Sequence, residues 1–149
     1  MSRINENILN IMIVEDDRIF VKLHAHLIQR ETNIEPTAFF GADEALEFLN
    51  ENSDEDTKFL IFLDLNMPGR NGWEFIEICR KKPYVNNISI MIVTSSIYKA
   101  DHILAKSYDE VIGFVSKPLK KENVWEAMKE FRLQESVMNG FGTVEKNIG

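Results

Sequence analysis

Cysteine is almost missing from this sequence, since Cys79 is the single one among 149 residues. One thiol cannot form an internal disulfide, so a reducing cytoplasmic environment is the expected location. The sequence also has no apolar run near the roughly 20 residues that span a bilayer. Its first residues, MSRINENILN, lack the long apolar stretch of a secretory signal. We therefore expect a cytoplasmic protein without a membrane segment.

Basic residues are the minority charge, with 17 lysines and arginines against 24 acids and a net charge of −7. A broad basic surface that binds nucleic acid directly is therefore not expected. Glycine is scarce at 7 residues, and no glycine-rich phosphate loop follows the first apolar run, which argues against a dinucleotide or flavin site. The remaining composition, 44% hydrophobic and 28% charged, is typical of one globular domain with a self-supporting core.

Short apolar runs alternate with helical patterns five times along the chain. The predicted strands cover residues 7–14, 34–40, 59–63, 88–93 and 111–115, and the predicted helices cover residues 18–31, 42–50, 72–82, 97–110 and 120–138. Runs one, three and four are almost continuously apolar, as in parallel strands that are covered on both faces. This alternation predicts an α/β fold, a doubly wound three-layer (βα)5 sandwich whose parallel sheet has the order 2-1-3-4-5. Pro36 lacks an N–H, so the second strand fits an edge of that sheet.

The helical patterns also predict which side of each helix faces the core. The expected inward residues are Phe20, Leu23 and Leu27; Ala45, Leu46, Phe48 and Leu49; Ile97, Ala100, Leu104 and Tyr108; and Val124, Met128 and Phe131. Pro83 is expected to end the third helix. Seven acids and no base lie between Asp43 and Asp56, which is the pattern of a solvent-exposed helix face and loop.

Polar residues occur where four of the apolar runs stop. They are Glu15, Asp16 and Asp17 after the first run, Asp64 after the third, Thr94 and Ser95 after the fourth, and Lys117 after the fifth. In an open α/β sheet, ligands bind beyond the carboxyl ends of the strands, near the change in strand order. We therefore expect these side chains to meet in one site although they are far apart in the sequence.

Clustered carboxylates need a cation, because two of them about 4 Å apart repel by roughly 1 kcal/mol in water and about 4 kcal/mol at an effective dielectric of 20. The available ligands are hard oxygens with no nearby His or Cys, which favours Mg²⁺. Since Mg²⁺ commonly keeps several waters and a phosphate oxygen, a phosphoryl site is predicted as well. An Asp carboxylate of this group can be the nucleophile that forms an aspartyl phosphate. Mg²⁺ and Lys117 would neutralise phosphoryl oxygens, and Thr94 would donate a hydrogen bond to one of them.

Four motifs, IMIVEDD, IFLDLNMPGRNG, MIVTSS and FVSKP, occur in this order along the chain. In sequence and spacing they resemble the CheY-like receiver domain of two-component response regulators, and the resemblance covers about residues 8–137. It implies the flavodoxin-like (βα)5 fold with the strand order 2-1-3-4-5. Each motif alone is a weak to moderate signal, whereas the four together are a strong one.

The resemblance assigns roles to the acidic residues. Asp64 matches the phosphoacceptor of the family and also one of its Mg²⁺ ligands. Asp16 matches a direct Mg²⁺ ligand, Glu15 an acid that acts through water, and Asn66 a residue whose backbone carbonyl binds the metal. Asp17 lies just past the acidic pair and is expected to be peripheral.

The resemblance also implies a switch. Thr94 matches the switch hydroxyl, and the small Ser95 leaves the phosphoryl pocket open. Lys117 matches the family's lysine, whose bond to Pro118 is often cis. Phe114 lies at the position of the switch aromatic; it can pack inward but has no hydroxyl for a partner. On phosphorylation Thr94 would move inward, the aromatic would follow, and the surface of the fourth helix, fifth strand and fifth helix would change.

The implied function is acceptance of a phosphoryl group from a histidine kinase or a histidine phosphotransfer protein in two-component phosphorelay signalling. The chain would catalyse only its own phosphorylation and dephosphorylation, so it is not expected to be an enzyme with outside substrates. It would signal to an unnamed downstream protein or relay phosphate, as a monomer or a phosphorylation-dependent dimer. The lifetime of the phosphoryl group would depend on residues such as Asn66 and Ser96.

The expected boundaries are an N-terminal extension at residues 1–7, the receiver domain at 8–138 and a flexible tail at 139–149. Only about a dozen residues follow the last predicted helix, so a stand-alone receiver without an output domain is expected.

Two other functions remain open from the residues alone. One is a phosphatase that works through an aspartyl phosphate, although such enzymes usually have a second acid where this chain has Asn66. The other is a phosphate-independent interaction module that keeps only the receiver fold, against which the intact set of acids, hydroxyl and lysine argues.

The remaining notable residues have simpler predictions. His24 and His26 are two apart on a helix and do not share a face, so they are not expected to bind a metal together. His102 is expected at the surface and Trp73 in packing. Trp125 is either a packing residue or a contact for a partner.

Overall fold

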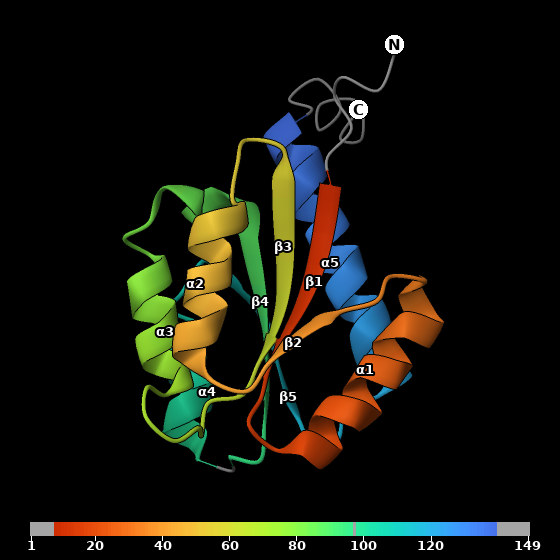
Figure 1. The fold of residues 1–149 in the computed structure, drawn as a ribbon, viewed down its shortest axis with the longest axis vertical. Coiled ribbons are helices and arrows are strands. Elements are labelled where there is room, and N and C mark those ends of the chain that lie inside the picture. Colours follow the sequence, from red (N-terminus) through yellow and green to blue (C-terminus); the bar gives the residue numbers. More distant parts are fainter. Residues whose placement is uncertain (1–7, 97, 140–149) are drawn as a thin grey trace.

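The computed structural model describes residues 8–96 and 98–139 (Figure 1). It contains a five-stranded parallel sheet with the predicted order β2-β1-β3-β4-β5. The strands are β1 (Ile8–Val14), β2 (Thr37–Phe39), β3 (Thr57–Leu63), β4 (Ile88–Thr94) and β5 (Val111–Ser116). The helices are α1 (Arg18–Thr32), α2 (Ala42–Asn52), α3 (Gly72–Cys79), α4 (Lys99–Ala105) and α5 (Lys121–Asn139). The predicted extension at 1–7, and the predicted tail beyond residue 139, lie outside the described residues.

Helices cover both faces of the sheet, with α2, α3 and α4 on one face and α1 and α5 on the other (Figure 1). The alternation of side chains along β1 divides the core into two layers. Met12 and Val14 pack in the layer with α2 and α3, whereas Ile11 and Ile13 pack in the layer with α1 and α5. Because full burial of one such side chain contributes about 1.5–3 kcal/mol, both layers stabilise the position of β1 in the sheet.

The central strands are buried along their whole length, which confirms the prediction of strands covered on both faces. Val14 lies opposite Leu63, and Leu63 lies opposite Ile92. The residues that follow β1, β3 and β4 therefore emerge at the same edge of the sheet. β2 is an edge strand as predicted, and Pro36 directly precedes it.

The buried face of α1 is shifted along the sequence from the predicted one. The predicted stripe was Phe20, Leu23 and Leu27, and the buried residues are Val21, His24 and Ile28. Leu23 is 51% exposed. Both sets of residues have helical spacing. The buried set was not recognised in the sequence because its middle residue, His24, is polar.

The helix predicted at 97–110 is also wrong in extent, because α4 covers only Lys99–Ala105. Its end is tightened by bonds between residues three apart, including Ser107 N–H to the Leu104 carbonyl (2.9 Å). Tyr108 is buried beyond the helix, whereas Leu104 is 40% exposed and Ala105 is the buried helical residue. Ala100 of the predicted stripe is exposed, and Ile97 lies outside the described residues.

Two smaller differences concern α3 and α5. Helix α3 ends at Cys79, before the predicted 82, and Pro83 begins a separate 3-10 helix, Pro83–Asn87. On α5, Val124 and Phe131 are buried as predicted, and Ala127 is buried between them. Nowhere in the described ranges does a helix combine the length and apolarity needed to cross a membrane.

The start of α3 is packed tightly against the end of β3. Asn71 and Glu74 form a capping box at this helix terminus. The Gly72 N–H donates to the Leu65 carbonyl (2.9 Å). A Cβ at Gly72 would lie 2.6 Å from the Asp64 carbonyl oxygen and 2.8 Å from the Leu65 Cα. Only glycine therefore allows this close approach of the helix to the strand end.

Replacing Gly72 with alanine should destabilise the fold by about 2 kcal/mol or more, because the added methyl group meets backbone atoms on both sides. Gly41→Ala is the matched control, since a Cβ there meets nothing within 4 Å and should cost less than about 1 kcal/mol. Urea denaturation followed by circular dichroism measures both variants. Equal losses for the two would contradict the close packing at Gly72.

Candidate functional site

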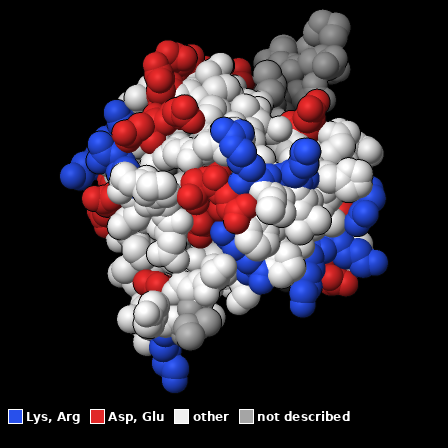
Figure 2. All heavy atoms as spheres, turned by 60° about the horizontal axis from the view of Figure 1, so that its bottom comes forward, with Lys and Arg blue, Asp and Glu red and all other residues white. Residues whose placement is uncertain are grey.

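Three carboxylates meet at the carboxyl edge of the sheet. One carboxylate oxygen from each of Glu15, Asp16 and Asp64 lies within 4.8 Å of the others. Glu15 and Asp64 are buried, at 3% and 4% exposure, and Asp16 is not. The adjacency follows from the pairing of β1 with β3, since the Asp64 N–H donates to the Val14 carbonyl (3.0 Å). Figure 2, turned toward this end of the sheet, shows acidic side chains grouped near the middle of the face with basic side chains beside them.

Lys117 joins the two buried carboxylates. Its Nζ lies 2.7 Å from Glu15 Oε1 and 3.2 Å from Asp64 Oδ2. Burial lowers the pKa of Lys117, but the hydrogen bond to Glu15 and the nearby carboxylate charges outweigh it, so this pKa is raised. Burial raises the pKa of Glu15, and the bonds from Lys117 and the Asp17 N–H offset part of that rise. The lysine is therefore held charged between two acids.

The side chains of this group fit a hard divalent cation. Three carboxylates against one lysine leave an excess of negative charge, part of it buried, which needs a further cation. Within the part of the chain that the structure describes, the group includes no histidine or cysteine. An all-oxygen donor set of this kind suits Mg²⁺.

Asp17 and Asn66 lie beside the cluster. Asp17 Oδ1 accepts from the Ile19 and Phe20 N–H groups and caps α1, so it serves the helix rather than the acid group. The Asn66 N–H donates to Asp64 Oδ1 (3.3 Å), and its side chain is exposed. This bond orients the Asp64 carboxylate from the β3–α3 connection.

Thr94 lies at the same edge and is completely buried. Its carbonyl accepts from the Lys117 N–H (3.0 Å), which joins the ends of β4 and β5. Its Oγ1 accepts from the Ser96 N–H (3.2 Å), while Ser95 is exposed. The structure thus brings the predicted hydroxyl next to the segment that carries the lysine.

Phe114 on β5 lies opposite Ile92 of β4 and is half-buried. Its ring stacks on His102 of α4, with centroids 4.8 Å apart and an interplanar angle of 16°. His102 is exposed as predicted, but its stacking on Phe114 was not predicted. The two residues lie on different elements, and their spacing in the sequence does not predict a contact.

Asp101 is a residue that the sequence analysis missed. Its carboxylate accepts from Ser96 Oγ (2.5 Å) and from the Trp73 indole N–H (3.3 Å). Trp73 also stacks on Tyr108, with centroids 5.8 Å apart. These contacts fix the β4–α4 connection to α3. Trp73 is thus a packing residue with a polar bond.

His24 is the second residue with a contact that the sequence did not reveal. It is 2% exposed, and its Nε2 accepts from the Leu119 N–H (3.0 Å), two residues after Lys117. Burial, and then the charge of Lys117, lower its pKa to about 4. His26 is exposed, so the two histidines lie on different faces, as predicted. The Lys117–Pro118 bond is cis.

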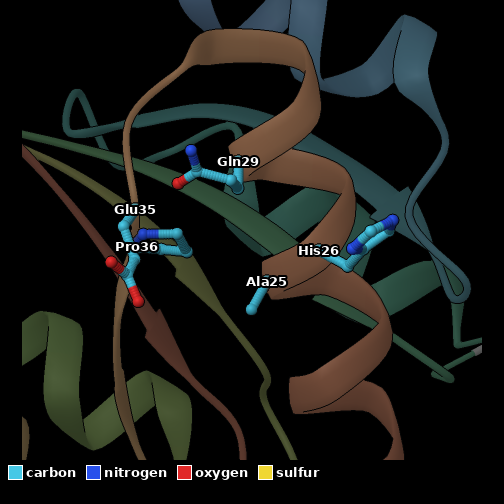
Figure 3. Close-up of a pocket in the computed structure, with 5 residues that line it drawn as sticks. All are labelled: Ala25, His26, Gln29, Glu35 and Pro36. Carbon is cyan, nitrogen blue, oxygen red and sulfur yellow. The ribbon is translucent and has the colours of Figure 1, made fainter.

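A hollow between α1 and the segment that leads into β2 is separate from this cluster (Figure 3). It is lined by Ala25, His26, Gln29, Glu35 and Pro36. The ring of His26 points away from Glu35 and Pro36 (Figure 3). None of the clustered acids lines this hollow, and we assign it no function.

A family model described as the response regulator receiver domain matches residues 11–129. The chain belongs to this family. A two-component response regulator of Arabidopsis thaliana is 27% identical over 151 residues, covering 95% of this chain and 77% of that protein. A crystal structure of a two-component response regulator from Cytophaga hutchinsonii is 26% identical, with a TM-score of 0.76, and the match covers 86% of this chain and 99% of that one.

Other relatives are longer proteins that contain a matching region. A hybrid signal transduction histidine kinase of Dictyostelium discoideum is 28% identical over 125 residues, which are 81% of this chain and 7% of the kinase. The match to the transcriptional regulatory protein MalR of Bacillus subtilis covers 52% of that regulator. The similarity therefore supports the receiver domain and does not extend over the full length of these proteins.

The receiver fold and the family are thus confirmed, and the acidic cluster of this receiver lies where the sequence predicted it. The functions of the individual residues and the domain boundaries stay predictions.

Mg²⁺ should raise the thermal stability of the receiver, because a cation relieves the repulsion among the three acids. At a tenfold excess over its dissociation constant, binding adds about 1.4 kcal/mol, which corresponds to about 3–6 °C in Tm. Differential scanning calorimetry with and without Mg²⁺ measures this shift. Asp16→Asn should abolish most of it. The neighbouring Asp17→Asn, which keeps a helix-capping side chain, should retain it. An unchanged shift in Asp16→Asn would exclude Asp16 as a ligand, and loss in both variants would show that the effect is not specific to Asp16.

The stability should also fall at acidic pH because of His24. The unfolded histidine binds a proton below about pH 6.5, whereas the folded one does so only below about 4. Between these values the unfolded state binds more protons, so the unfolding free energy decreases as the pH falls, by up to about 3 kcal/mol at pH 4. Urea denaturation from pH 7 to pH 4 tests this. Carboxylates also titrate in this range, so the comparison is with His24→Gln, whose decrease should be smaller by this amount; parallel pH profiles would show that His24 is not buried as a neutral ring.

Proposed function

We propose that this receiver accepts a phosphoryl group on Asp64 from a histidine kinase or a histidine phosphotransfer protein, with Mg²⁺ bound to the acidic cluster. The observation that carries the proposal is the buried Asp64 carboxylate, bonded to Lys117 and adjacent to Glu15 and Asp16. A buried acid at a strand end, bonded to a lysine and beside two further acids that could hold a metal, suits attack on phosphorus.

The proposed reaction forms one bond and breaks another. An Asp64 carboxylate oxygen attacks phosphorus, the N–P bond of the donor phosphohistidine breaks, and the donor nitrogen keeps the electron pair. Asp16, Glu15 through water and the Asn66 carbonyl would hold Mg²⁺, which supplies positive charge to the phosphoryl oxygens. Lys117 would exchange its contact with Asp64 for one with a phosphoryl oxygen. The chain acts only on itself in this scheme, so it is not an enzyme with outside substrates.

The proposed switch begins at Thr94. Its hydroxyl accepts from the Ser96 N–H in this structure, and it would donate to a phosphoryl oxygen after transfer. Phe114 would then leave its stack on His102 and pack inward. These changes would alter the exposed apolar side chains at α4, which are Ile103 and Leu104 in the helix and Tyr98 at its N-cap.

The output would therefore act through the surface of α4, β5 and α5. Since Phe114 has no hydroxyl, a partner at this surface would recognise apolar contacts rather than a phenol. A downstream protein, a second copy of the receiver or a further phosphotransfer protein could each occupy it. Histidine kinase partnership is implied by the two-component family itself.

The alternative of a phosphatase is less well supported. Two residues after Asp64 the chain has the exposed Asn66, whose N–H bonds to Asp64. An amide cannot act there as the acid and base that turnover of outside substrates requires. The phosphate-independent module is disfavoured by the closeness of the three acids and the lysine.

Asp64→Asn should abolish phosphorylation while it leaves the fold intact, because the amide is a poor nucleophile of the same shape. Intact-protein mass after incubation with acetyl phosphate measures this, with and without Mg²⁺. Wild type should gain one phosphoryl group only when Mg²⁺ is present. The exposed Asp109→Asn is the matched control and should behave as wild type. Equal modification of Asp64→Asn would place the acceptor elsewhere.

Lys117→Ala should slow phosphorylation by roughly 100-fold, the usual cost of removing one charge-stabilising donor, with a smaller effect on Mg²⁺ binding. The rate of mass increase and the Mg²⁺-dependent Tm shift separate the two effects. Lys120→Ala removes an exposed lysine three residues away and should change neither. A Lys117→Ala protein that is phosphorylated at the wild-type rate would remove this lysine from the site.

A further inference from the structure

The place of the Lys117 ammonium depends on how its backbone is held. A lysine side chain has several rotatable bonds, so ordering it costs free energy unless its surroundings restrict it. On one side of the residue, the Lys117 N–H bonds to the Thr94 carbonyl (3.0 Å). On the other side Pro118 has no N–H, and the next backbone donor, that of Leu119, bonds to His24 on α1 (3.0 Å). The lysine thus lies between one restraint from β4 and one from α1.

The restraint from α1 is buried and specific. Leu119 is 5% and His24 is 2% exposed, and 95 positions separate them in the sequence. An unpaired buried N–H is costly, so this bond selects one position for the segment after β5. An aliphatic side chain in place of His24 would fill the space but would leave the Leu119 N–H without its acceptor.

A second contact from α1 reaches the charged end of the lysine. Phe20 lies one helical turn before His24, and the two rings pack with centroids 5.4 Å apart. The Phe20 ring is also 4.5 Å from Lys117 Nζ, on the distance scale of a cation–π contact. The same turn of α1 therefore contacts both the ammonium and the backbone beyond it.

We propose that His24 is a positioning residue for phosphoryl transfer: through Leu119 and Phe20 it holds Lys117 where its ammonium meets both Glu15 and Asp64. This inference rests on the proposed function of Asp64 and Lys117. It assigns a role in the reaction to a histidine that touches neither the phosphoryl group nor the metal ligands. Its neutral ring supplies the acceptor nitrogen.

The competing role is purely structural, in which His24 only satisfies a buried N–H. Both roles predict lower stability for His24→Leu, so stability alone does not distinguish them. The two roles make different predictions for the folded protein. If His24 positions Lys117, the lysine side chain moves when the acceptor nitrogen is lost, and a side chain with another acceptor returns the lysine to its place.

The experiment compares His24→Leu, His24→Gln and the exposed His26→Leu with wild type, at a temperature at which circular dichroism shows all four folded. With saturating Mg²⁺ and acetyl phosphate, the initial rate of phosphoryl addition should fall roughly tenfold or more in His24→Leu. It should return to within about threefold of wild type in His24→Gln, which keeps an acceptor, and His26→Leu should match wild type. Equal rates in folded His24→Leu and wild type, or equal losses in both His24 variants, would overturn the proposal.

A second readout is independent of phosphorylation. In NMR spectra without phosphodonor, the Leu119 amide and the Lys117 ε-methylene signal, assigned with Lys117→Arg, should both shift in His24→Leu and return in His24→Gln. An unchanged Lys117 signal in His24→Leu would overturn the positioning role. Wild-type protein that takes up no phosphoryl group would refute the proposed function instead, and the Lys117 signal would still decide whether His24 places the lysine.

Discussion

The rest of the site depends on the buried ion bridge in which Lys117 lies between Glu15 and Asp64. Removing carboxylates from water costs several kcal/mol per ion, and the attraction of a lysine offsets this only when the geometry is good. One ammonium cannot neutralise two buried acids and the adjacent Asp16. The bridge therefore leaves net negative charge at the site, which is consistent with a metal site. A fully neutralised cluster would lack this charge.

The hydrophobic strands are what make this costly arrangement possible. β3 and β4 are buried along their whole length, and β1 contributes to both core layers. Their parallel register brings the acid after β1, the acid after β3 and Thr94 at the end of β4 to one edge of the sheet. Gly72 then lets α3 begin against the Asp64 carbonyl, so the connection that follows Asp64 is fixed by packing. Stability from the core thus supports a charge cluster that is unfavourable by itself.

The sheet order and the cluster were predictable because both follow from short-range patterns. An apolar run that stops at an acid marks a strand end, and the topology of such folds brings those ends together. The inward face of α1 was not predictable, because His24 is a polar residue type and the long-range bond that satisfies its buried ring comes from Leu119. The short length of α4 depends likewise on Tyr108, which is held by Glu77 (2.5 Å) and Trp73 rather than by helical spacing. The stacking of His102 on Phe114 joins α4 to β5, and the spacing of residues in the sequence does not predict such a contact between two elements.

Thr94 is the junction between the two sets of contacts that the sequence did not reveal. Its carbonyl accepts from the Lys117 N–H, and beyond Lys117 the chain is held by His24. Its hydroxyl accepts from Ser96, whose own hydroxyl bonds to Asp101. The backbone bond can persist while the hydroxyl changes partner, because the two oxygens are independent acceptors. In the proposed switch, the lysine side of the site would therefore stay fixed while the α4 side rearranges, with the buried Thr94 at the boundary between the two.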